Sequence, residues 1–290
     1  MRSLLILVAA SLSFGSIIEA ADPIMPLRVM SFNLRYGLAD DGANRWEARR
    51  DLVAETVRAF DPDILGTQET LRMQADFLLS QLDGYDYFGR SRMTTPSEHC
   101  GILYRRERFT RLAGGHFWLS ERPEQPASKG WDAALPRMAT WLLLADASSP
   151  RPLLVVNTHF DHRGREARHR SAALLRDRIA ALQAIAADPD VVVTGDFNTD
   201  AGSPPHQTLL DGSVLVDTYA AVSDGDAPSG TFNGFRGVTD GPRIDWILAG
   251  ESLAIEATGI DRTERDGRTP SDHFPVTAVL VARPPASGGR

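Results

Sequence analysis

The sequence predicts an α/β protein in which two sheets pack face to face and the helices lie outside them. The order of patterns is strand-helix-strand-helix, then a run of strands, then strand-helix-strand and more strands. Only three stretches show strong helical periodicity, which is too few to cover both faces of one large sheet. Neither an internal repeat nor a linker divides the chain, so we expect a single domain.

Composition narrows the classes of function. The 290 residues, 42% hydrophobic and 24% charged, suffice for a globular protein with a substantial core. The net charge of −7 argues against a protein that binds nucleic acid mainly through phosphates, because such proteins usually carry a basic surface. A local basic patch would still permit nucleic acid, but a small or locally recognised substrate is favoured. Cys100 is the single cysteine, so no intrachain disulfide can form.

The first 20 residues read as an export signal. Arg2 precedes an apolar stretch over 4–18, and Ile18-Glu19-Ala20 offers a cleavage site before Ala21. The apolar stretch is shorter than the ~20 residues that span a bilayer, so we expect no stable membrane insertion. The predicted organisation is a signal peptide over 1–20, a folded domain over 25–282 and a flexible tail over 283–290. We expect a monomer that is secreted or periplasmic.

The domain begins with alternating strands and helices. Its pattern predicts a strand at Leu27–Phe32 and a helix at Arg45–Phe60, which Asp61-Pro62 ends. A short strand at Asp63–Thr67 and an amphipathic helix at Leu71–Leu82 follow.

From Tyr85 the pattern changes to successive short strands, which without helices between them are typical of antiparallel pairing. The loop Ser120–Arg137 contains several Pro, Gly and Trp residues. It is too long for a plain connection and is either functional or poorly ordered. The predicted strands are Tyr85–Gly89, Gly101–Tyr104, Phe109–Leu112, His116–Leu119 and Thr140–Leu144.

The last part of the domain contains the longest predicted helix, Glu166–Ala187, between two apolar strands. Those strands are Leu153–Thr158 and the β-branched run Val191–Val193. The remaining predictions are a helix at Pro204–Leu210, a Gly-, Asp- and Ser-rich loop through Gly230, and strands at Arg243–Ala249, Ala254–Gly259 and Phe274–Val281.

Polar side chains follow or interrupt the apolar strands at six places. Each place alone has a structural explanation, such as a turn, a helix cap or a hydrogen-bonded buried histidine. Asp245 is the hardest to explain in this way, because it interrupts the run Ile244-Asp-Trp246-Ile247-Leu248, where an unpaired carboxylate would be costly. The six places are Asn33, Glu69, His159 with Asp161, Asp196 with Asn198, Asp245, and Ser271-Asp272-His273.

Taken in order, these motifs resemble one known pattern over residues 27–282. They are Ser-Phe-Asn33-Leu-Arg, Gln-Glu69-Thr, Asn-Thr-His159-Phe-Asp161-His, Gly-Asp196-Phe-Asn198, Arg-Ile-Asp245-Trp-Ile and Ser-Asp272-His273-Phe-Pro. The pattern is similar to that of the endonuclease/exonuclease/phosphatase (deoxyribonuclease I-like) superfamily. This superfamily includes deoxyribonucleases, abasic-site endonucleases, inositol polyphosphate phosphatases, sphingomyelinases and deadenylases. The long loop 117–137 resembles an elaboration of its exported bacterial branch.

The resemblance implies a four-layered α/β/β/α sandwich with two mixed, mainly antiparallel sheets. It also implies cleavage of a phosphate ester with Mg²⁺, or else Mn²⁺ or Ca²⁺, held by Asn33, Glu69 and Asp272. Asp196 would orient or deprotonate the attacking water, and Asn198 would donate a hydrogen bond. Asp245 would hold His273, which would stabilise the reacting phosphorus centre, and His159 would assist the leaving oxygen as a general acid.

The candidates for substrate binding are more scattered along the chain. Lys129 and Arg137 could clamp a phosphate, and Trp118 and Trp131 could stack on a sugar or base. Both tryptophans could equally be core or loop anchors. Further candidates are Arg35, Arg45 and Asp161.

The predicted function is a secreted, divalent-metal-dependent phosphohydrolase. Its catalytic domain would cleave a phosphate mono- or diester. A small, sugar- or lipid-linked substrate is favoured. An extracellular nuclease is the alternative, and a non-catalytic binding module on the same fold is a remote one. The acidic net charge departs from the nuclease branches, and the chain lacks a cysteine pair like that of the secreted deoxyribonucleases.

Overall fold

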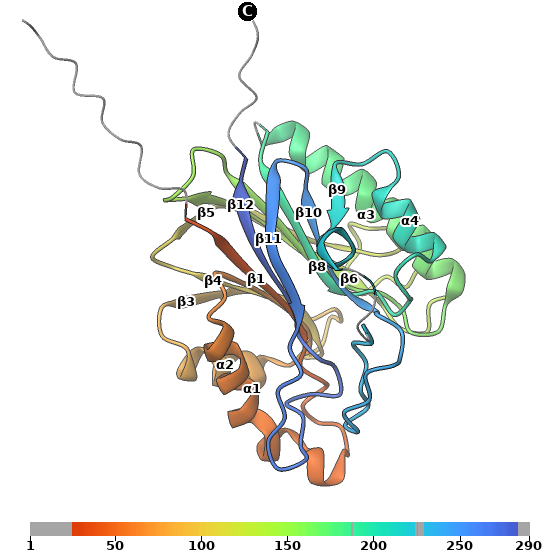
Figure 1. Cartoon of the computed structure of the whole chain (residues 1–290). Helices are drawn as coiled ribbons and strands as arrows, with labels where there is room; N and C mark the ends of the chain where they lie inside the picture. The colour runs from red at the N-terminus through yellow and green to blue at the C-terminus, as the bar shows by residue number, and fades with distance from the viewer. Residues whose placement is uncertain (1–24, 187, 224, 226–228, 284–290) are drawn as a thin grey trace, which may run out of the picture.

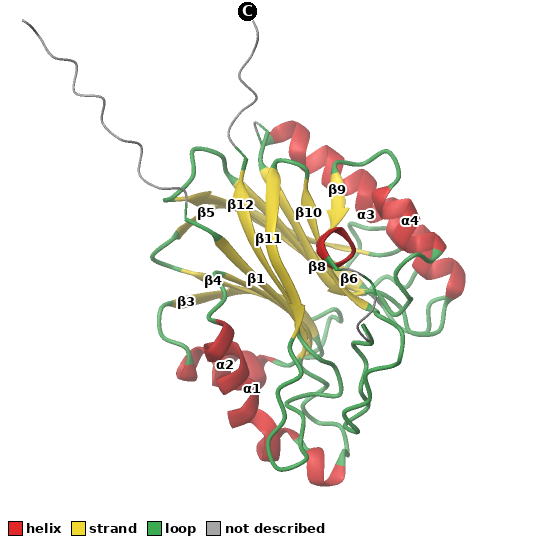
Figure 2. Ribbon diagram, in the orientation of Figure 1, coloured by secondary structure: helices red, strands yellow, loops and turns green. Residues whose placement is uncertain are grey.

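Two six-stranded sheets pack face to face in the computed structural model, with helices on their outer faces (Figures 1 and 2). This arrangement confirms the predicted sandwich. The structure describes residues 25–186, 188–223, 225 and 229–283. The predicted signal peptide and residues 284–290 of the predicted tail lie outside the described residues. Within the described part, no helix has the length and apolarity needed to cross a membrane.

The first sheet has the strand order β11-β12-β1-β2-β4-β3. Strands β1 and β2 are parallel, and the other pairs are antiparallel. Its strands are β1 (Leu27–Asn33), β2 (Ile64–Thr70), β3 (Tyr85–Phe88), β4 (His99–Arg105), β11 (Leu253–Ile260) and β12 (Val276–Ala282).

The second sheet has the order β5-β6-β7-β8-β10-β9, with β7 and β8 as its parallel pair. Strands β4 and β5 follow each other in sequence yet belong to different sheets. The strands of this sheet are β5 (Phe109–Trp118), β6 (Met138–Asp146), β7 (Leu153–His159), β8 (Asp190–Asp196), β9 (Leu215–Asp217) and β10 (Asp245–Gly250).

Three apolar layers hold the sandwich together. Residues such as Val29, Ile102 and Val192 fill the space between the sheets. In the outer layers, Leu78 of α2 packs with α1 and the first sheet, and Leu175 of α3 packs with the second sheet. The helical elements are η1 (Gly42–Asn44), α1 (Trp46–Phe60), α2 (Arg72–Gln81), α3 (Arg165–Ile185), α4 (Pro204–Leu210) and α5 (Thr218–Val222).

Two predictions of secondary structure are wrong. The predicted separate strands Phe109–Leu112 and His116–Leu119 form one strand, β5, because a bulge between Arg111 and Ala113 absorbs the irregularity while pairing with β6 continues. The predicted loop before Gly230 contains β9 and α5. The side chain of Asp217 caps α5 by accepting the backbone N–H groups of Tyr219 and Ala220.

The topology gathers polar strand ends at one edge of the sandwich. Strands β1 and β2 run parallel and so end at the same edge, as do β7 and β8. Strands β10 and β12 run antiparallel to β8 and β1, so they begin where those strands end. Asp245 consequently pairs in register with Asp196.

A buried polar link joins the two sheets beneath this edge. Asn157 of β7 donates from Nδ2 to the carbonyl oxygens of Thr67 and Gly101, both at 2.8 Å. Its Oδ1 accepts from Gln68 Nε2 at 2.7 Å and from Thr194 Oγ1 at 3.0 Å. Because buried amide groups are costly unless paired, this network favours one fixed position of the sheets relative to each other.

Candidate active site

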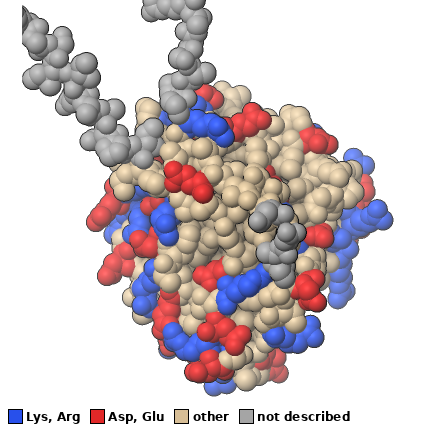
Figure 3. All heavy atoms as spheres, viewed as in Figure 1, with Lys and Arg blue, Asp and Glu red and all other residues tan. Residues whose placement is uncertain are grey.

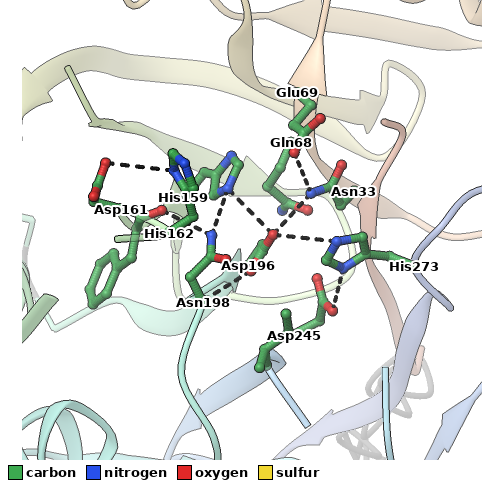
Figure 4. A network of polar contacts seen from close by, with 12 residues as sticks. Asn33, Gln68, Glu69, His159, Asp161, His162, Asp196, Asn198, Asp245 and His273 are labelled. Atoms are coloured by element: carbon green, nitrogen blue, oxygen red, sulfur yellow. Dashed lines mark hydrogen bonds and ion pairs between the residues drawn. The ribbon is translucent and has the colours of Figure 1, made fainter. Parts of the chain in front are cut away.

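Asp196, the last residue of β8, lies at the centre of the polar cluster (Figure 4). Its side chain is buried and accepts two hydrogen bonds at 2.9 Å, from Asn198 N to Oδ1 and from Asn33 Nδ2 to Oδ2. Burial and the nearby carboxylate of Asp245 raise the pKa of Asp196. A carboxylate with a raised pKa, held by two donors, is suited to accept a proton from water.

His273 and Asp245 form a hydrogen-bonded pair on one side of Asp196. His273 Nδ1 lies 2.8 Å from Asp245 Oδ2, and its Nε2 lies 3.8 Å from Asp196 Oδ2. Burial opposes a charge on His273, but the carboxylates of Asp245 and Asp196 outweigh it and raise its pKa well above the ordinary value. The imidazole is therefore cationic at neutral pH and can stabilise an anionic phosphoryl group.

His159 lies on the other side of Asp196 and has a cationic neighbour instead. Arg137 donates from NH1 to His159 Nδ1 at 3.0 Å. Burial and the charge of Arg137 lower the pKa of His159 well below its ordinary value. The ring is therefore neutral.

The contact with Arg137 also determines which nitrogen of His159 carries the proton. A guanidinium has no acceptor, so Nδ1 accepts and Nε2 carries the proton. Nε2 lies 3.3 Å from Asp196 Oδ2 and 2.9 Å from Asn198 Nδ2. A neutral ring cannot accept from both Arg137 and Asn198, and Asn198 Nδ2 instead donates to Phe160 O at 3.1 Å.

Glu69 and Asp272 face the cavity on the side of the first sheet. Glu69 accepts from Tyr36 N at 2.9 Å and from Asn33 Nδ2 at 3.3 Å. Burial raises the pKa of Asp272, and the negative charge of Glu69 adds to this effect. Two neighbouring carboxylates are hard oxygen ligands and fit a divalent cation. The amide oxygen of Asn33, the third predicted ligand, accepts from Arg35 N at 2.9 Å.

A second cluster of possible metal ligands lies beside that donor set. Asp196, Asp245 and His273 offer ligand atoms within 4.8 Å of one another. The hydrogen bond between His273 and Asp245 already occupies one ligand atom of each. Asp245 Oδ1 is buried and has no hydrogen-bond partner among the described residues.

Unusual backbone conformations orient several of these side chains. Glu69, Asn198 and Arg35 adopt left-handed conformations, with φ values of 55°, 49° and 59°. The pairing of β2 with β4 also shifts register between Thr67 and Thr70, on either side of Glu69. Such conformations are uncommon in residues other than glycine and cluster at functional sites.

The cluster forms the floor of a cavity of about 430 Å³. Both predicted arginines that line the cavity already have partners. Arg35 forms a bidentate ion pair with Asp41, and Arg137 contacts Asp161 Oδ2, His159 Nδ1 and His162 Nδ1. The cavity is lined by Arg35, Tyr36, Glu69, Arg92, Glu98, Leu135, Arg137, His159, His162, Asp196, Asn198, Phe232, Ile244, Asp272 and His273.

Four other predicted binding residues do not line this cavity. Arg45 is exposed beside Glu47 at 3.9 Å, and Lys129 is exposed on the loop 120–137. The backbone of Trp131 donates to Glu121. Asp161 is buried, and its Oδ1 accepts the backbone N–H groups of Ala134, Arg163 and Gly164. Asp161 therefore organises the loop that carries Arg137.

Trp118 is a structural anchor. It is buried and donates from Nε1 to Arg92 O at 2.8 Å. Of the two roles considered for Trp118, the structure therefore shows the core anchor.

The sequence analysis missed Arg92, Glu98 and His162 as cavity residues. Arg92 and Glu98 belong to the connection between β3 and β4, where no periodicity distinguishes a site from a turn. A basic and an acidic residue at the two ends of the Ser- and Thr-containing segment 92–98 were the one available signal.

Residues 30–273 match the model of the endonuclease/exonuclease/phosphatase family. The chain belongs to this family. Its members are phosphoester hydrolases, and so the protein is a hydrolase of this class. Enzymes of the family are typically dependent on a divalent metal, and the donor sets described above provide candidate metal sites.

Solved structures agree with this assignment. A family protein of Bacteroides thetaiotaomicron is 34% identical, has a TM-score of 0.84 and is matched over 92% of this chain and 98% of its own. A mannosyl-6-phosphatase of the same species is 36% identical, with a TM-score of 0.81 and coverage of 88% and 99%. The human Nocturnin catalytic domain, at 22% identity, 89% and 95% coverage and a TM-score of 0.73, shows the shared fold alone.

Proposed function

We propose that the protein is an exported, Mg²⁺-dependent phosphatase that hydrolyses the phosphomonoester of a small, sugar- or lipid-linked alcohol. The observation that carries this proposal is the buried Asp196, held by Asn33 and Asn198 at the floor of a cavity that also presents Glu69 and Asp272. The cavity volume of about 430 Å³ suits a small ligand. The similarity to a mannosyl-6-phosphatase supports a monoester as the substrate.

In the proposed mechanism, Asp196 orients the attacking water and takes its proton as the new oxygen–phosphorus bond forms. The His273 imidazolium and the Asn198 amide stabilise the negative charge on the phosphoryl oxygens. As the ester bond breaks, His159 passes its Nε2–H to the leaving oxygen and takes up the proton that Asp196 received from water, since Nε2 lies 3.3 Å from Asp196 Oδ2, so the ring stays neutral. Asn33, Glu69 and Asp272 would hold a divalent cation, which polarises the phosphoryl group and compensates its charge.

Charge pairing argues against a long polyanionic substrate. The arginines that line the cavity are paired with Asp41, Glu98 and Asp161. On the face shown in Figure 3, acidic and basic side chains are interspersed. Nucleic-acid enzymes need a continuous positive track for the backbone, so the nuclease alternative is less well supported.

Assays on four esters test the activity. Protein lacking residues 1–20 would be given Mg²⁺ with mannose 6-phosphate, bis(p-nitrophenyl) phosphate, plasmid DNA or sphingomyelin. We expect release of inorganic phosphate from the monoester and loss of activity with a chelator. Cleavage of DNA without hydrolysis of the monoester would overturn the proposal in favour of a nuclease. No hydrolysis of any ester would favour the binding module.

Export has its own test. Cleavage of the predicted signal peptide should give a mature protein that begins at Ala21 and is recovered from the periplasm or medium. N-terminal sequencing checks this outcome. Full-length protein confined to the cytoplasm would contradict it.

A further inference from the structure

Arg92 and Glu98 are held at the cavity wall by a short, ordered hairpin. The backbone N–H of Arg92 donates to Glu98 O at 2.9 Å, and Ser91 forms a bridge with His99. Trp118 Nε1 donates to Arg92 O from β5 at 2.8 Å. These contacts hold the backbone of both residues, so their side chains are presented to the cavity by a preorganised scaffold.

The two side chains form a largely buried ion pair with unused hydrogen-bonding capacity. Arg92 NH2 lies 2.6 Å from Glu98 Oε1. Arg92 is only 8% exposed, and its Nε is buried with no hydrogen-bond partner among the described residues. Glu98 Oε2 likewise accepts no hydrogen bond from the described side chains or backbone. Burying such a pair is costly, and an unsatisfied donor in it adds to the cost.

The pair lies next to the reacting centre. Arg92 and Glu98 share the wall of the cavity with Glu69, Arg137 and His159. In the proposed mechanism Glu69 belongs to the phosphate side and His159 faces the leaving oxygen. The alcohol part of a bound ester would therefore extend toward Arg92 and Glu98.

The chemistry of the pair selects among possible alcohols. Its two charges compensate each other, so it offers a donor and an acceptor without a strong net field. Neighbouring hydroxyl groups satisfy both, because each hydroxyl donates to a carboxylate and accepts from a guanidinium. An alkyl chain would leave both groups desolvated and unsatisfied, and a second phosphate would meet the negative charge of Glu98.

We propose that Arg92 and Glu98 form the subsite for the alcohol part of the substrate and select a polyhydroxylated, sugar-like alcohol over an alkyl one. This inference rests on the proposed phosphatase activity. It also decides between the sugar-linked and lipid-linked substrates that the proposed function leaves open.

A matched pair of substrates tests the subsite. Mannose 6-phosphate and glucose 6-phosphate carry hydroxyls, and n-hexyl phosphate has a similar length without them. For Glu98→Gln, we expect kcat/KM on the better hexose phosphate to fall at least ~10-fold, because a lost charged hydrogen bond costs about that much. Activity on n-hexyl phosphate should change by less than about 3-fold. Glu47→Gln, at an exposed pair with Arg45, is the matched control.

A second variant guards against misfolding, since Glu98→Gln leaves Arg92 without its carboxylate. The double variant Arg92→Met/Glu98→Leu replaces the pair by apolar groups of similar volume, which proteins often tolerate. It should lose the preference for the hexose phosphate and gain relative activity on n-hexyl phosphate.

Failure of the subsite and failure of the phosphatase proposal give different results. If the wild type hydrolyses both kinds of ester and the variants change both equally, or neither, the subsite is wrong and the phosphatase activity stands. If the wild type hydrolyses none of the three monoesters, the phosphatase proposal fails and the subsite falls with it.

Discussion

His159 and His273 flank the same carboxylate, Asp196, but their neighbours put the two rings into opposite states. Arg137 donates to Nδ1 of His159, whereas Asp245 accepts from Nδ1 of His273. The pKa of His159 is lowered by burial and Arg137, while that of His273 is raised by the two carboxylates against the effect of burial. In one cavity, Asp196, the proposed base, therefore has the neutral imidazole of His159 on one side and the cationic imidazole of His273 on the other.

The contrast shows how one fold divides the work of phosphate hydrolysis. Strand ends from the two sheets each bring a histidine to Asp196. The residue that contacts Nδ1 of each ring decides the protonation state of that histidine and hence its role. A cation on one side suits the phosphoryl oxygens, and a neutral N–H on the other suits the leaving oxygen. Substitutions of Asp196, or of Asp245 and Arg137, which contact Nδ1 of the two rings, should lower activity to different degrees.

The largest effect is expected from removing the carboxylate that both histidines face. Asp196→Asn keeps the shape but cannot accept a proton, so kcat should fall by ~10³-fold or more. Steady-state kinetics with circular dichroism would check this. Asp190→Asn, at the other end of β8 and hydrogen-bonded to Ser252, is the control and should keep normal kcat. Equal losses in both variants would contradict the proposed role.

The next largest effect is expected from Asp245, which accepts the hydrogen bond from Nδ1 of His273. Asp245→Asn retains an acceptor for Nδ1 but removes the negative charge, so the pKa of His273 should fall. Loss of the cation should lower kcat by ~10²-fold with a smaller change in KM. An unchanged kcat in the folded variant would show that the charge on His273 is not used.

A smaller effect is expected from Arg137, which donates a hydrogen bond to Nδ1 of His159. Arg137→Met removes the donor to Nδ1, so the pKa of His159 should rise and kcat/KM should fall ~10-fold. His162→Asn removes a different partner of Arg137 at the cavity wall and leaves the contact with His159, so its effect should stay below about 3-fold. If the two variants lose activity equally, Arg137 does not act through His159.

The smallest effect concerns the burial of two histidines and is measured as stability. Burial lowers the pKa of His99 and of His116 to about 4. Between about pH 4 and pH 6.5 the unfolded chain therefore binds more protons, so the free energy of unfolding should rise with pH over this window. Urea denaturation of His99→Gln and His116→Gln should show a shallower rise, and the exposed His169→Gln should match the wild type.

Most of the catalytic floor could be predicted from the sequence because it is built from strand ends. Asn33, His159 and Asp196 each follow an apolar run, and parallel pairing carries them to one edge. Arg92 and Glu98 depend on how a hairpin folds over the second sheet, which no local pattern encodes. Lys129 was predicted from its residue type alone, and the loop turns it outward, because Asp161 and the helix start anchor the segment around it.

The most direct test is the protonation of the two imidazoles in the folded protein. Nitrogen-detected NMR at pH 7 distinguishes Nδ1–H from Nε2–H, and His159→Gln and His273→Gln would assign the signals among the seven histidines. We predict protons on both ring nitrogens of His273, and a bare Nδ1 with a protonated Nε2 on His159. A protonated Nδ1 on His159, or a bare nitrogen on His273, would contradict the account.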